Sequence, residues 1–472
     1  MLLFLDQLRA DALGCYGNPT VATPHIDRLA TQGTVFTSAY TPSPVCVPAR
    51  ASLISGREPQ QLGCYDNEDA MPETPTIMSV LTEAGYRTHG IGKMHFTPDS
   101  SDLRGFQTRE SEEEFGSCET DDYLAWLNST GHGHVQYPHG LRDEMYYIPQ
   151  LSQLPEEAHP SRWIADRSLA FLEREDDPFF LWSSFIAPHP PFSPPAPWHR
   201  RYPPSLLPDP HRPDGGNGLL TAFNHLQNRY KFRDGGRDRR LDQLIRSYYY
   251  ASVTFADHQI GRILNGLEES GRLDDTVIIL SADHGEFLGD YGCYGKRSFL
   301  DPAARIPLIC SGPGFGAGRR VSAPATLIDI LPTITRVAGV PTPTTEGTAL
   351  QDPVPDRAAF GQYQRGELGL YCVVTNRWKY IWSAPDRREY LLDRRNDPAE
   401  TMNLAYNVRA REALLAMRGT AVDHFIGLDG ARLAAESRNQ PLRIGAAPDD
   451  GGVAGMHSLP IDRDAATLIV QD

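Results

Sequence analysis

The segment TVIILSADHGE, residues 276–286, decides the fold class. It begins with a short apolar run of the kind found in a buried strand of a parallel sheet, and the run ends at polar residues that include Asp283 and His284. A long helical pattern over residues 241–269 precedes this strand, and Gly271 separates the two. A helix that leads into a buried strand is the repeating unit of α/β proteins, so the segment predicts that class.

Three other segments repeat this pattern of an apolar strand that ends in polar side chains. The predicted strands are residues 2–5, 86–92 and 178–186, followed by Asp6 and Gln7, by Lys93 and His95, and by His189, respectively. Ligands of open α/β sheets bind at the carboxyl ends of the strands. We therefore expect these four strand ends, which together carry acids, bases and a cation, to form one site.

Helices alternate with these strands. They are predicted from Thr23 to Leu29, from Thr74 to Gly85, from a Ser161 cap to Glu175, and over residues 241–269. This alternation predicts a large, mostly parallel sheet sandwiched by helices.

The composition changes twice in the second half of the chain. Residues from Ala187 to about Arg240 are rich in Pro, Gly and Arg, which predicts a long surface excursion or lid. A second change occurs near residues 341–347. The elements predicted beyond it are antiparallel strands over 370–383 and 388–393 and a helix over about 408–418. We expect a large α/β domain over residues 1–345, a smaller C-terminal α+β domain on a short antiparallel sheet over 346–440, and a tail or oligomer arm over 441–472.

Charge and composition exclude some classes of function. The chain has 472 residues, a hydrophobic content of 40% and a formal net charge of −15, so it can form a large core but lacks the basic excess of a nucleic-acid binder. An anionic substrate would need a local group of cations. The chain has seven cysteines in no CxxC pair, which argues against a disulfide framework or a structural zinc site. Only five apolar residues, Met1 to Leu5, precede Asp6, too few for a signal peptide, and no segment resembles a membrane span, so we expect a cytoplasmic protein.

One cysteine occupies an unusual position. In PVCVPARA, residues 44–51, Pro48 fits the first turn of a helix and Cys46 lies just before it. Its sulfur would lie near unpaired backbone N–H groups at the positive end of a helix dipole, which suits an anion or an activated nucleophile. Arg50 would lie in the same turn.

The predicted strand ends also offer metal ligands. Asp6, Gln7, Asp283 and His284 supply two carboxylates, an amide oxygen and an imidazole, a reasonable shell for a divalent cation. The oxygen donors favour calcium, and His284 leaves manganese or zinc open.

Several motifs together resemble one family. In order along the chain they are DQLRADALGCYG (6–17), TPHIDRLATQG (23–33), SPVCVPARASLISGR (43–57), GIGKMHF (90–96), APHPPF (187–192), DHQIGRIL (257–264), SADHGEFLGDYGCYGK (281–296), RWKYIWS (377–383) and EYLLDRRNDPAETMNLA (389–405). They resemble the type I, formylglycine-dependent sulfatases of the alkaline phosphatase superfamily, a group that also holds phosphonate monoester hydrolases. The resemblance implies an alkaline-phosphatase-like fold.

The resemblance also implies a role for the unusual cysteine. In this family the cysteine of C-x-P-x-R is oxidised to formylglycine by a maturation enzyme, which would read Cys46, Pro48 and Arg50 here. The hydrated aldehyde would act as the nucleophile and, with the ligands already named, would bind the metal ion, for which calcium is expected first.

Further roles carry over residue by residue. Arg50 would hold the nucleophile, Lys93 would bridge nucleophile and substrate, and His95 would act on the geminal hydroxyl during elimination. His189 and Lys296 would contact the transferring group, one of them assisting the leaving oxygen. Asn67 matches an asparagine that the phosphonate monoester hydrolase branch places near the substrate.

Two departures from the commoner sulfatase pattern keep alternatives open. Many sulfatases have two adjacent acids where this chain has Asp6 and Gln7, and Asp-Asn where it has Asp283 and His284. The first hypothesis is a sulfuric ester hydrolase of a small or aryl sulfate, and the second is a phosphonate monoester or phosphodiester hydrolase. A catalytically silent binding protein is a third. The hypothesis that the protein forms a homo-oligomer rests on the predicted tail, residues 441–472.

Overall fold

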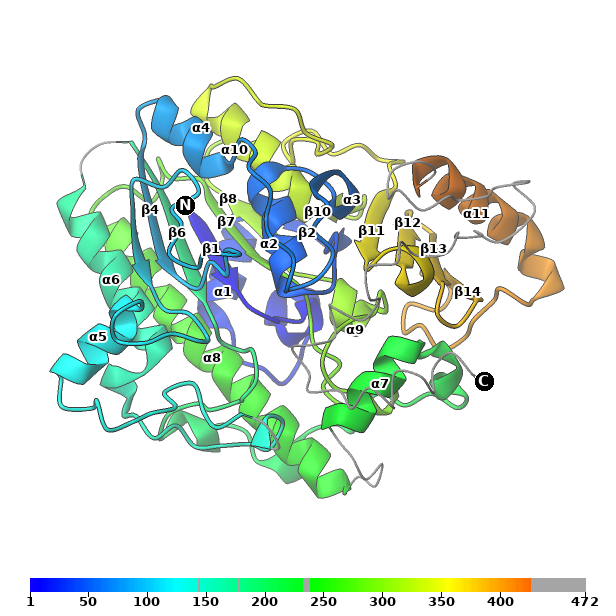
Figure 1. The fold of residues 1–472 in the computed structure, drawn as a ribbon, viewed down its shortest axis with the longest axis horizontal. Helices are drawn as coiled ribbons and strands as arrows, with labels where there is room; N and C mark the ends of the chain where they lie inside the picture. Colours follow the sequence, from blue (N-terminus) through cyan, green and yellow to red (C-terminus); the bar gives the residue numbers. More distant parts are fainter. Residues whose placement is uncertain (143–144, 176–177, 232–237, 426–472) are drawn as a thin grey trace.

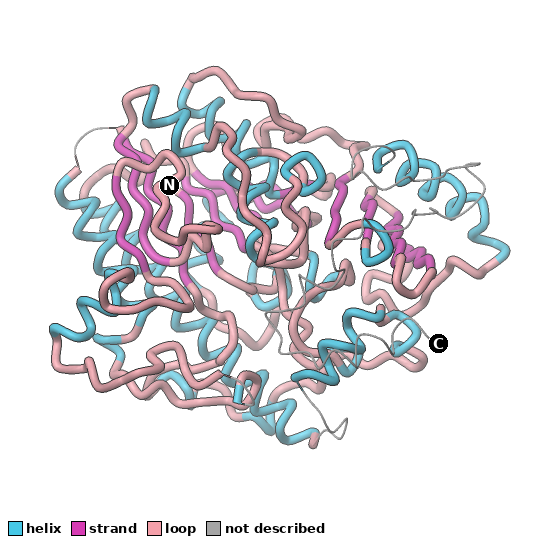
Figure 2. The backbone as a smooth tube through the Cα atoms, viewed as in Figure 1, coloured by secondary structure: helices cyan, strands magenta, loops and turns pink. Residues whose placement is uncertain are grey.

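A large mixed sheet forms the centre of the molecule. The structure is a computed structural model that describes residues 1–142, 145–175, 178–231 and 238–425. In these residues eight strands form one sheet in the order β5-β4-β6-β1-β7-β8-β2-β9 (Figures 1 and 2). The pairs are parallel except for those of β8 with β7 and with β2. The strands are β1 Leu2–Leu5, β2 Gly33–Phe36, β4 Arg87–Gly92, β5 Thr108–Ser111, β6 Phe179–Phe185, β7 Ile278–Ala282, β8 Leu308–Ser311 and β9 Arg319–Val321. The predicted mostly parallel sheet is confirmed.

Helices cover both faces of this sheet. The larger ones on one face are α1 Pro24–Gln32, α6 Pro160–Arg174 and α8 Arg239–Glu269, and those on the other are α2 Cys46–Ser55, α4 Ile77–Glu83 and α10 Ile330–Ala338 (Figure 1). Central strands are buried throughout and mostly apolar because this sandwich covers both of their faces. Two predicted helix starts were wrong: Thr76 caps α4, and His159 caps α6 because its ring accepts the Ser161 N–H. Within the described residues, no helix has both the length and the apolar character of a membrane span.

The strand register brings the predicted polar ends to one edge of the sheet. Leu5 at the end of β1 pairs with Phe185 of β6 on one side and with Ala282 of β7 on the other. Gly92 at the end of β4 pairs with Ser184 of β6. The residues that follow these four strands therefore emerge side by side, as parallel strands require.

A second, smaller sheet lies beside the first. Its four antiparallel strands are β11 Ala359–Tyr363, β12 Leu370–Val374, β13 Trp378–Ser383 and β14 Arg388–Asp393, in that order. One face packs on the large unit through a buried apolar cluster that includes Phe299 and Ile381, and α11, Arg411–Phe425, covers the other. The predicted strands and helix are present, β11 was not predicted, and the helix ends later than expected. The domain limits at 345 and 440 stay predictions, and the proposed arm at 441–472 lies outside the described residues.

The predicted surface excursion contains structured elements. Within it, α7, Ala222–Lys231, contributes Phe223 and Leu226 to the apolar cluster beneath the small sheet. Gln227 donates a hydrogen bond to the Tyr294 carbonyl and thereby contacts the loop that carries Lys296. The segment therefore supports the site from outside rather than forming only a loose lid. Remaining short elements are β3 Ala39–Tyr40, β10 Ala325–Thr326, α3 Pro59–Leu62, α5 Asp122–Ser129 and α9 Asp301–Ala304.

Candidate active site

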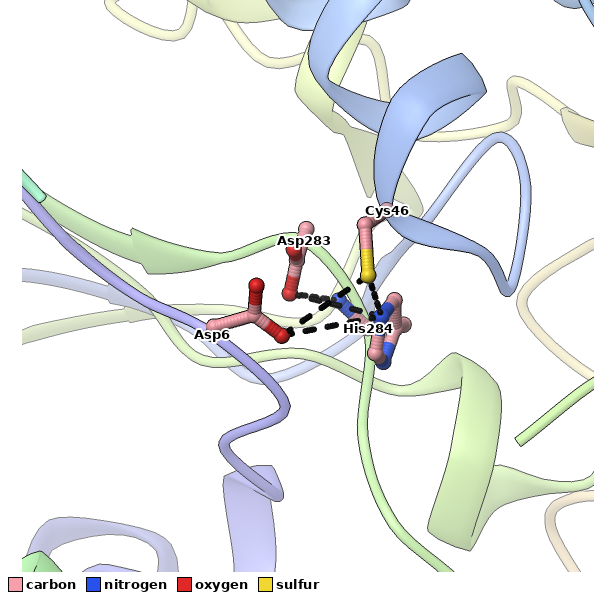
Figure 3. A group of neighbouring side chains, drawn as sticks. All are labelled: Asp6, Cys46, Asp283 and His284. Atoms are coloured by element: carbon pink, nitrogen blue, oxygen red, sulfur yellow. Dashed lines mark hydrogen bonds and ion pairs between the residues drawn. The ribbon is translucent and has the colours of Figure 1, made fainter. Parts of the chain in front are cut away.

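Four potential metal ligands converge at the carboxyl edge of the large sheet. Asp6 follows β1, Asp283 and His284 follow β7, and Cys46 is the first residue of α2. One ligand atom from each lies within 4.8 Å of the others, and all four side chains are buried (Figure 3). The Sγ atom of Cys46 lies 3.2 Å from His284 Nε2 and 3.9 Å from Asp6 Oδ1. The structure thus joins two strand ends and a helix start that the sequence placed far apart.

Helix α2 directs the sulfur into this group. All ten of its residues are buried, and Gly56 ends it in the left-handed conformation. Val45 occupies the N-cap position, and its side chain cannot accept a hydrogen bond from the helix backbone. Asn67 Oδ1 does so instead, because it accepts the Val47 N–H at 3.0 Å. Asn67 therefore pairs with one of the backbone N–H groups that have no partner within the helix at its start. This contact fixes the helix end that carries Cys46, and a substrate contact of Asn67 stays a prediction.

Gln7 and His284 each offer a further potential ligand atom. Gln7 Nε2 donates to Glu286, and the Oε1 atom of Gln7 is buried without a hydrogen-bond partner. His284 Nδ1 lies 3.0 Å from the Gly285 carbonyl, which can only accept, so Nδ1 carries the proton and Nε2 faces Cys46. A backbone carbonyl that fixes the tautomer in this way is a common arrangement for metal-binding histidines.

Arg50 and Lys93 neutralise the two acids. The Arg50 guanidinium donates to Asp6 Oδ2 and to Asp283 Oδ2, each at 3.2 Å, and is fully buried. The Lys93 ammonium lies 2.5 Å from Asp6 Oδ2 and also contacts Glu114. Before Lys93, Gly92 has φ +88°, and a Cβ there would lie 2.1 Å from the Ser184 carbonyl oxygen. Only glycine fits this turn, which aims Lys93 across the end of the sheet.

Two further predicted residues complete one side of the group. Lys296 Nζ lies 2.8 Å from Cys46 Sγ and 3.0 Å from His284 Nε2. His189 Nδ1 lies 2.7 Å from the Pro190 carbonyl, so its Nε2 is free to face Tyr146 and Glu114, each 3.4 Å away. Both side chains are buried.

His95 has no described hydrogen bond or ion pair with Cys46. It lies in the turn after β4 with φ 54°, and its backbone N–H donates to Glu113. Its Nδ1 atom is buried without a hydrogen-bond partner. A role for His95 in elimination stays a prediction.

Comparison with known proteins identifies the family. Residues 1–340 match the family model described as Sulfatase, which covers well over half of the chain. The chain belongs to the sulfatase family. An arylsulfatase from Clostridium perfringens is 31% identical and a choline-sulfatase from Rhizobium meliloti is 28% identical. These alignments cover 90% of this chain in both cases and 94% and 86% of the relatives, respectively.

Solved structures place this sulfatase family member in the alkaline phosphatase superfamily. The phosphonate monoester hydrolase of Agrobacterium radiobacter superimposes with a TM-score of 0.79 at 25% identity, over 89% of this chain and 94% of that one. The expected alkaline-phosphatase-like fold is therefore confirmed, together with the sulfatase resemblance and its phosphonate monoester hydrolase branch.

The electrostatics of this sulfatase site favour bound charge. Burial raises the pKa of Asp6, but the nearby Lys93, His189 and Arg50 hold it well below its usual range. Burial and the neighbouring Asp6 carboxylate raise the pKa of Asp283. Burial also opposes ionisation of Cys46, yet Lys296, Lys93 and His284 bring its pKa well below that of a free thiol. The cysteine position therefore lies where cations stabilise negative charge.

A divalent cation fits this residue set. Two fully buried carboxylates, an amide oxygen without a partner and an imidazole with its lone pair directed inward are donors that hard or borderline cations accept. A cation would also relieve the repulsion that raises the pKa of Asp283. The mixed oxygen and nitrogen donors leave the choice of ion open.

Sequence reasoning missed the residues that support this set from behind. Glu114 contacts Lys93, Tyr146 contacts His189, and Glu286 accepts hydrogen bonds from Gln7 and Tyr147. Glu286 could have been predicted from the sequence, because it is the last residue of the SADHGE motif that contains Asp283 and His284. Glu114 lies in a run of three glutamates that resembles an exposed acidic turn, so its sequence gave no sign of burial.

Proposed function

We propose that this chain hydrolyses small or aryl sulfate esters through a formylglycine formed from Cys46 and one divalent metal ion. The observation that carries the proposal is the position of Cys46 in a member of the sulfatase family: its Sγ lies at a buried helix start, 2.8 Å from Lys296 Nζ and 3.2 Å from His284 Nε2. Sulfate ester hydrolysis is the activity of the family, and the arylsulfatase and choline-sulfatase relatives agree with it.

Asp6, Gln7, Asp283 and His284, together with the oxidised side chain of Cys46, would hold the metal ion. When bound, such an ion lowers the pKa of a coordinated hydroxyl and polarises the ester oxygens. The majority of oxygen donors favours calcium, with manganese or zinc as alternatives because of His284. Arg50 keeps both carboxylates in place, since it donates to each of them.

The cationic side chains account for recognition of the ester. Lys93 contacts Asp6 and Lys296 contacts the Cys46 sulfur, so both lysines would contact the nucleophile and the oxygens of the sulfuryl group. When the S–O bond breaks, His189 or Lys296 gives a proton to the departing alcohol. Hydrated formylglycine supplies both the attacking hydroxyl and a second hydroxyl. His95 would accept the proton of that second hydroxyl, and the loss of this proton expels sulfate and restores the aldehyde.

Maturation requires a partner enzyme that reads Cys46, Pro48 and Arg50. All three residues are buried in α2. The formylglycine-generating enzyme would therefore act before this helix packs against the sheet.

A phosphonate monoester or phosphodiester hydrolase is the second candidate. The structural likeness to the phosphonate monoester hydrolase of Agrobacterium radiobacter favours it, as do Gln7 and His284 in place of the acid and asparagine of many sulfatases. The sulfatase proposal has the stronger support because the family model and the two relatives named above are sulfatases.

One comparison separates the two candidates. A single aryl alcohol would be presented as its sulfate monoester, its phosphonate monoester and its phosphodiester to enzyme with a measured fraction of converted Cys46. We expect the highest kcat/KM for the sulfate. A higher kcat/KM for either phosphoryl compound would make the second candidate the main activity. The Cys46→Ala variant is the control, and it should hydrolyse none of the three.

A further inference from the structure

A carboxylate occupies the side of the site that should receive the anionic group of the substrate. Glu114 lies in the loop after β5, and its side chain is 8% exposed. The carboxylate contacts the Lys93 ammonium, and its Oε1 lies 3.4 Å from His189 Nε2. On its other side, Oε2 lies 3.1 Å from the Arg142 guanidinium. Glu114 thus touches Lys93, which the proposed function places on the sulfuryl oxygens, and His189, which it places next to the departing alcohol.

Glu114 carries a negative charge in this position. Burial raises its pKa, but its contacts with His189, Lys93 and Arg142 outweigh burial and hold the pKa well below the usual range for a glutamate. A ligand bound to Lys93 and His189 would therefore lie next to a fixed carboxylate in a site with little water, where repulsion between like charges is strong.

We propose that Glu114 is a specificity-determining residue that makes this anion site select ligands with one negative charge over ligands with two. The inference deepens the proposed function and rests on it for the roles of Lys93 and His189. Sulfate monoesters, phosphonate monoesters and phosphodiesters each carry one negative charge. Phosphate monoesters above neutral pH and inorganic sulfate carry two.

Two consequences follow for the reaction. Phosphate monoesters would be poor substrates although their shape resembles that of sulfate esters, because their second charge is repelled by Glu114. The product of sulfate ester hydrolysis is a dianion formed from a monoanion, so the same repulsion would weaken product binding and speed its release. Arg142 limits the effect, because it lies on the far side of Glu114 and offsets part of its charge.

The test is a binding measurement that requires no turnover. Inorganic sulfate and methyl sulfate would be titrated by calorimetry, in excess calcium, into the Cys46→Ala protein and into the Cys46→Ala, Glu114→Gln protein. We expect Glu114→Gln to lower the Kd of inorganic sulfate by about tenfold more than it lowers the Kd of methyl sulfate. Equal changes in the two Kd values, or no change in either, would overturn the proposal.

Two matched variants complete the design. Glu119→Gln removes the same charge from an exposed position of the same loop and should leave the ratio of the two Kd values unchanged. Arg142→Gln removes the cation that offsets part of the Glu114 charge. It should raise the Kd of inorganic sulfate more than the Kd of methyl sulfate, which is the opposite of the change expected for Glu114→Gln. If Glu114→Gln does not fold, the Arg142→Gln shift decides, and an unchanged ratio there would contradict the proposal. If the proposed function is wrong, the matured wild type would not hydrolyse aryl sulfates. That result is separate from the ratio of the two Kd values, which is measured without turnover.

Discussion

Two buried lysines of this chain have similar surroundings but serve different purposes. Lys93 follows β4 of the large sheet, and Lys379 lies on β13 of the small one. Both side chains are fully buried, and each ammonium contacts two carboxylates. Burial of an ion pair is therefore not by itself a sign of function, because it occurs in both places.

The difference lies in what remains unpaired around each lysine. Lys379 has three acceptors for its three protons: Asp301, Glu400 and the Phe299 carbonyl. Lys93 contacts only two carboxylates among the described residues, and near it Gln7 Oε1 has no partner. The Lys379 cluster joins the small sheet to the large unit, whereas the Lys93 cluster lies at the carboxyl edge of the large sheet beside the potential metal ligands.

The carboxylates of the two clusters also titrate differently. Burial and the neighbouring Asp301 raise the pKa of Glu400 to about 7, since the two acids share one lysine. Glu114 has Arg142 and His189 in addition to its lysine, so its pKa falls despite burial. The surplus of positive groups at the Lys93 site is a further mark of an anion site.

Removal of the structural lysine should have the largest effect on stability. Lys379→Met leaves two buried acids without their cation, so we expect the free energy of unfolding to fall by about 3–5 kcal/mol. The kcat/KM per folded molecule should stay within about twofold of wild type. Denaturant titration and active-site-normalised kinetics check both. Arg377→Met is the control, because Arg377 is half-exposed and its pair with Asp393 should contribute little.

Removal of the other lysine should act on catalysis. We expect Lys93→Met to lower kcat/KM for an aryl sulfate by about 10²–10³-fold, or about 3–4 kcal/mol of transition-state stabilisation. The physical reason is the loss of the donor that lies between the nucleophile and the substrate oxygens. Activity is compared with Lys379→Met at equal folded fraction. If the two variants lose activity only in proportion to unfolding, the distinction between the clusters is wrong.

A divalent cation should stabilise one cluster only. At about 100 times its Kd, a metal ion should raise the free energy of unfolding of the metal-free protein by about 2.7 kcal/mol. Asp283→Asn should abolish this gain. The Asp301→Asn protein should show the same gain as wild type, although its free energy of unfolding without metal is lower. Thermal unfolding with calcium, manganese and zinc measures the gain and ranks the ions. A gain that survives Asp283→Asn would place the metal elsewhere.

The two glutamates should give pH effects of opposite sign. The folded pKa of Glu400, about 7, exceeds its unfolded value of 4.5, so the folded state binds more protons between these pH values. The contribution of Glu400 therefore falls as pH rises through this window, by at most about 1.4 kcal/mol per pH unit. Glu114 has a lowered pKa, so its contribution is present above the unfolded value and is lost on acidification.

Denaturant titrations across pH check these signs. Glu400→Gln should lose less stability than wild type between about pH 5 and pH 7. Glu114→Gln should instead lose less than wild type below about pH 4.5. Curves that run parallel to wild type in both variants would refute the assigned charges.

The sequence predicted the fold and most of the site because both depend on local transitions. An apolar run that ends in Asp6 or Asp283 indicates a buried strand and its exposed end at once, and parallel pairing then brings such ends together. The Pro48 and Gly56 positions similarly bound the helix that carries Cys46. Chemistry that adjoins a strand end can therefore be located before the structure is known.

Residues whose burial depends on distant partners could not be located this way. Glu114 stands in an acidic run, and its burial requires Lys93, Arg142 and His189 from three other segments. Lys379 alternates with aromatic residues as a surface lysine would, and only Asp301 and Glu400 show that it faces inward. Helix α7 was missed because its surroundings are rich in Pro and Gly.

The central claim is that chemistry occurs at Cys46, and one measurement tests it most directly. Preparations with different degrees of maturation would be assayed with an aryl sulfate, and the fraction of Cys46 converted to formylglycine would be measured by peptide mass spectrometry. We predict that kcat/KM per chain rises linearly with this fraction and extrapolates to zero at zero conversion. Hydrolysis of the sulfate that is independent of Cys46 conversion would contradict the account.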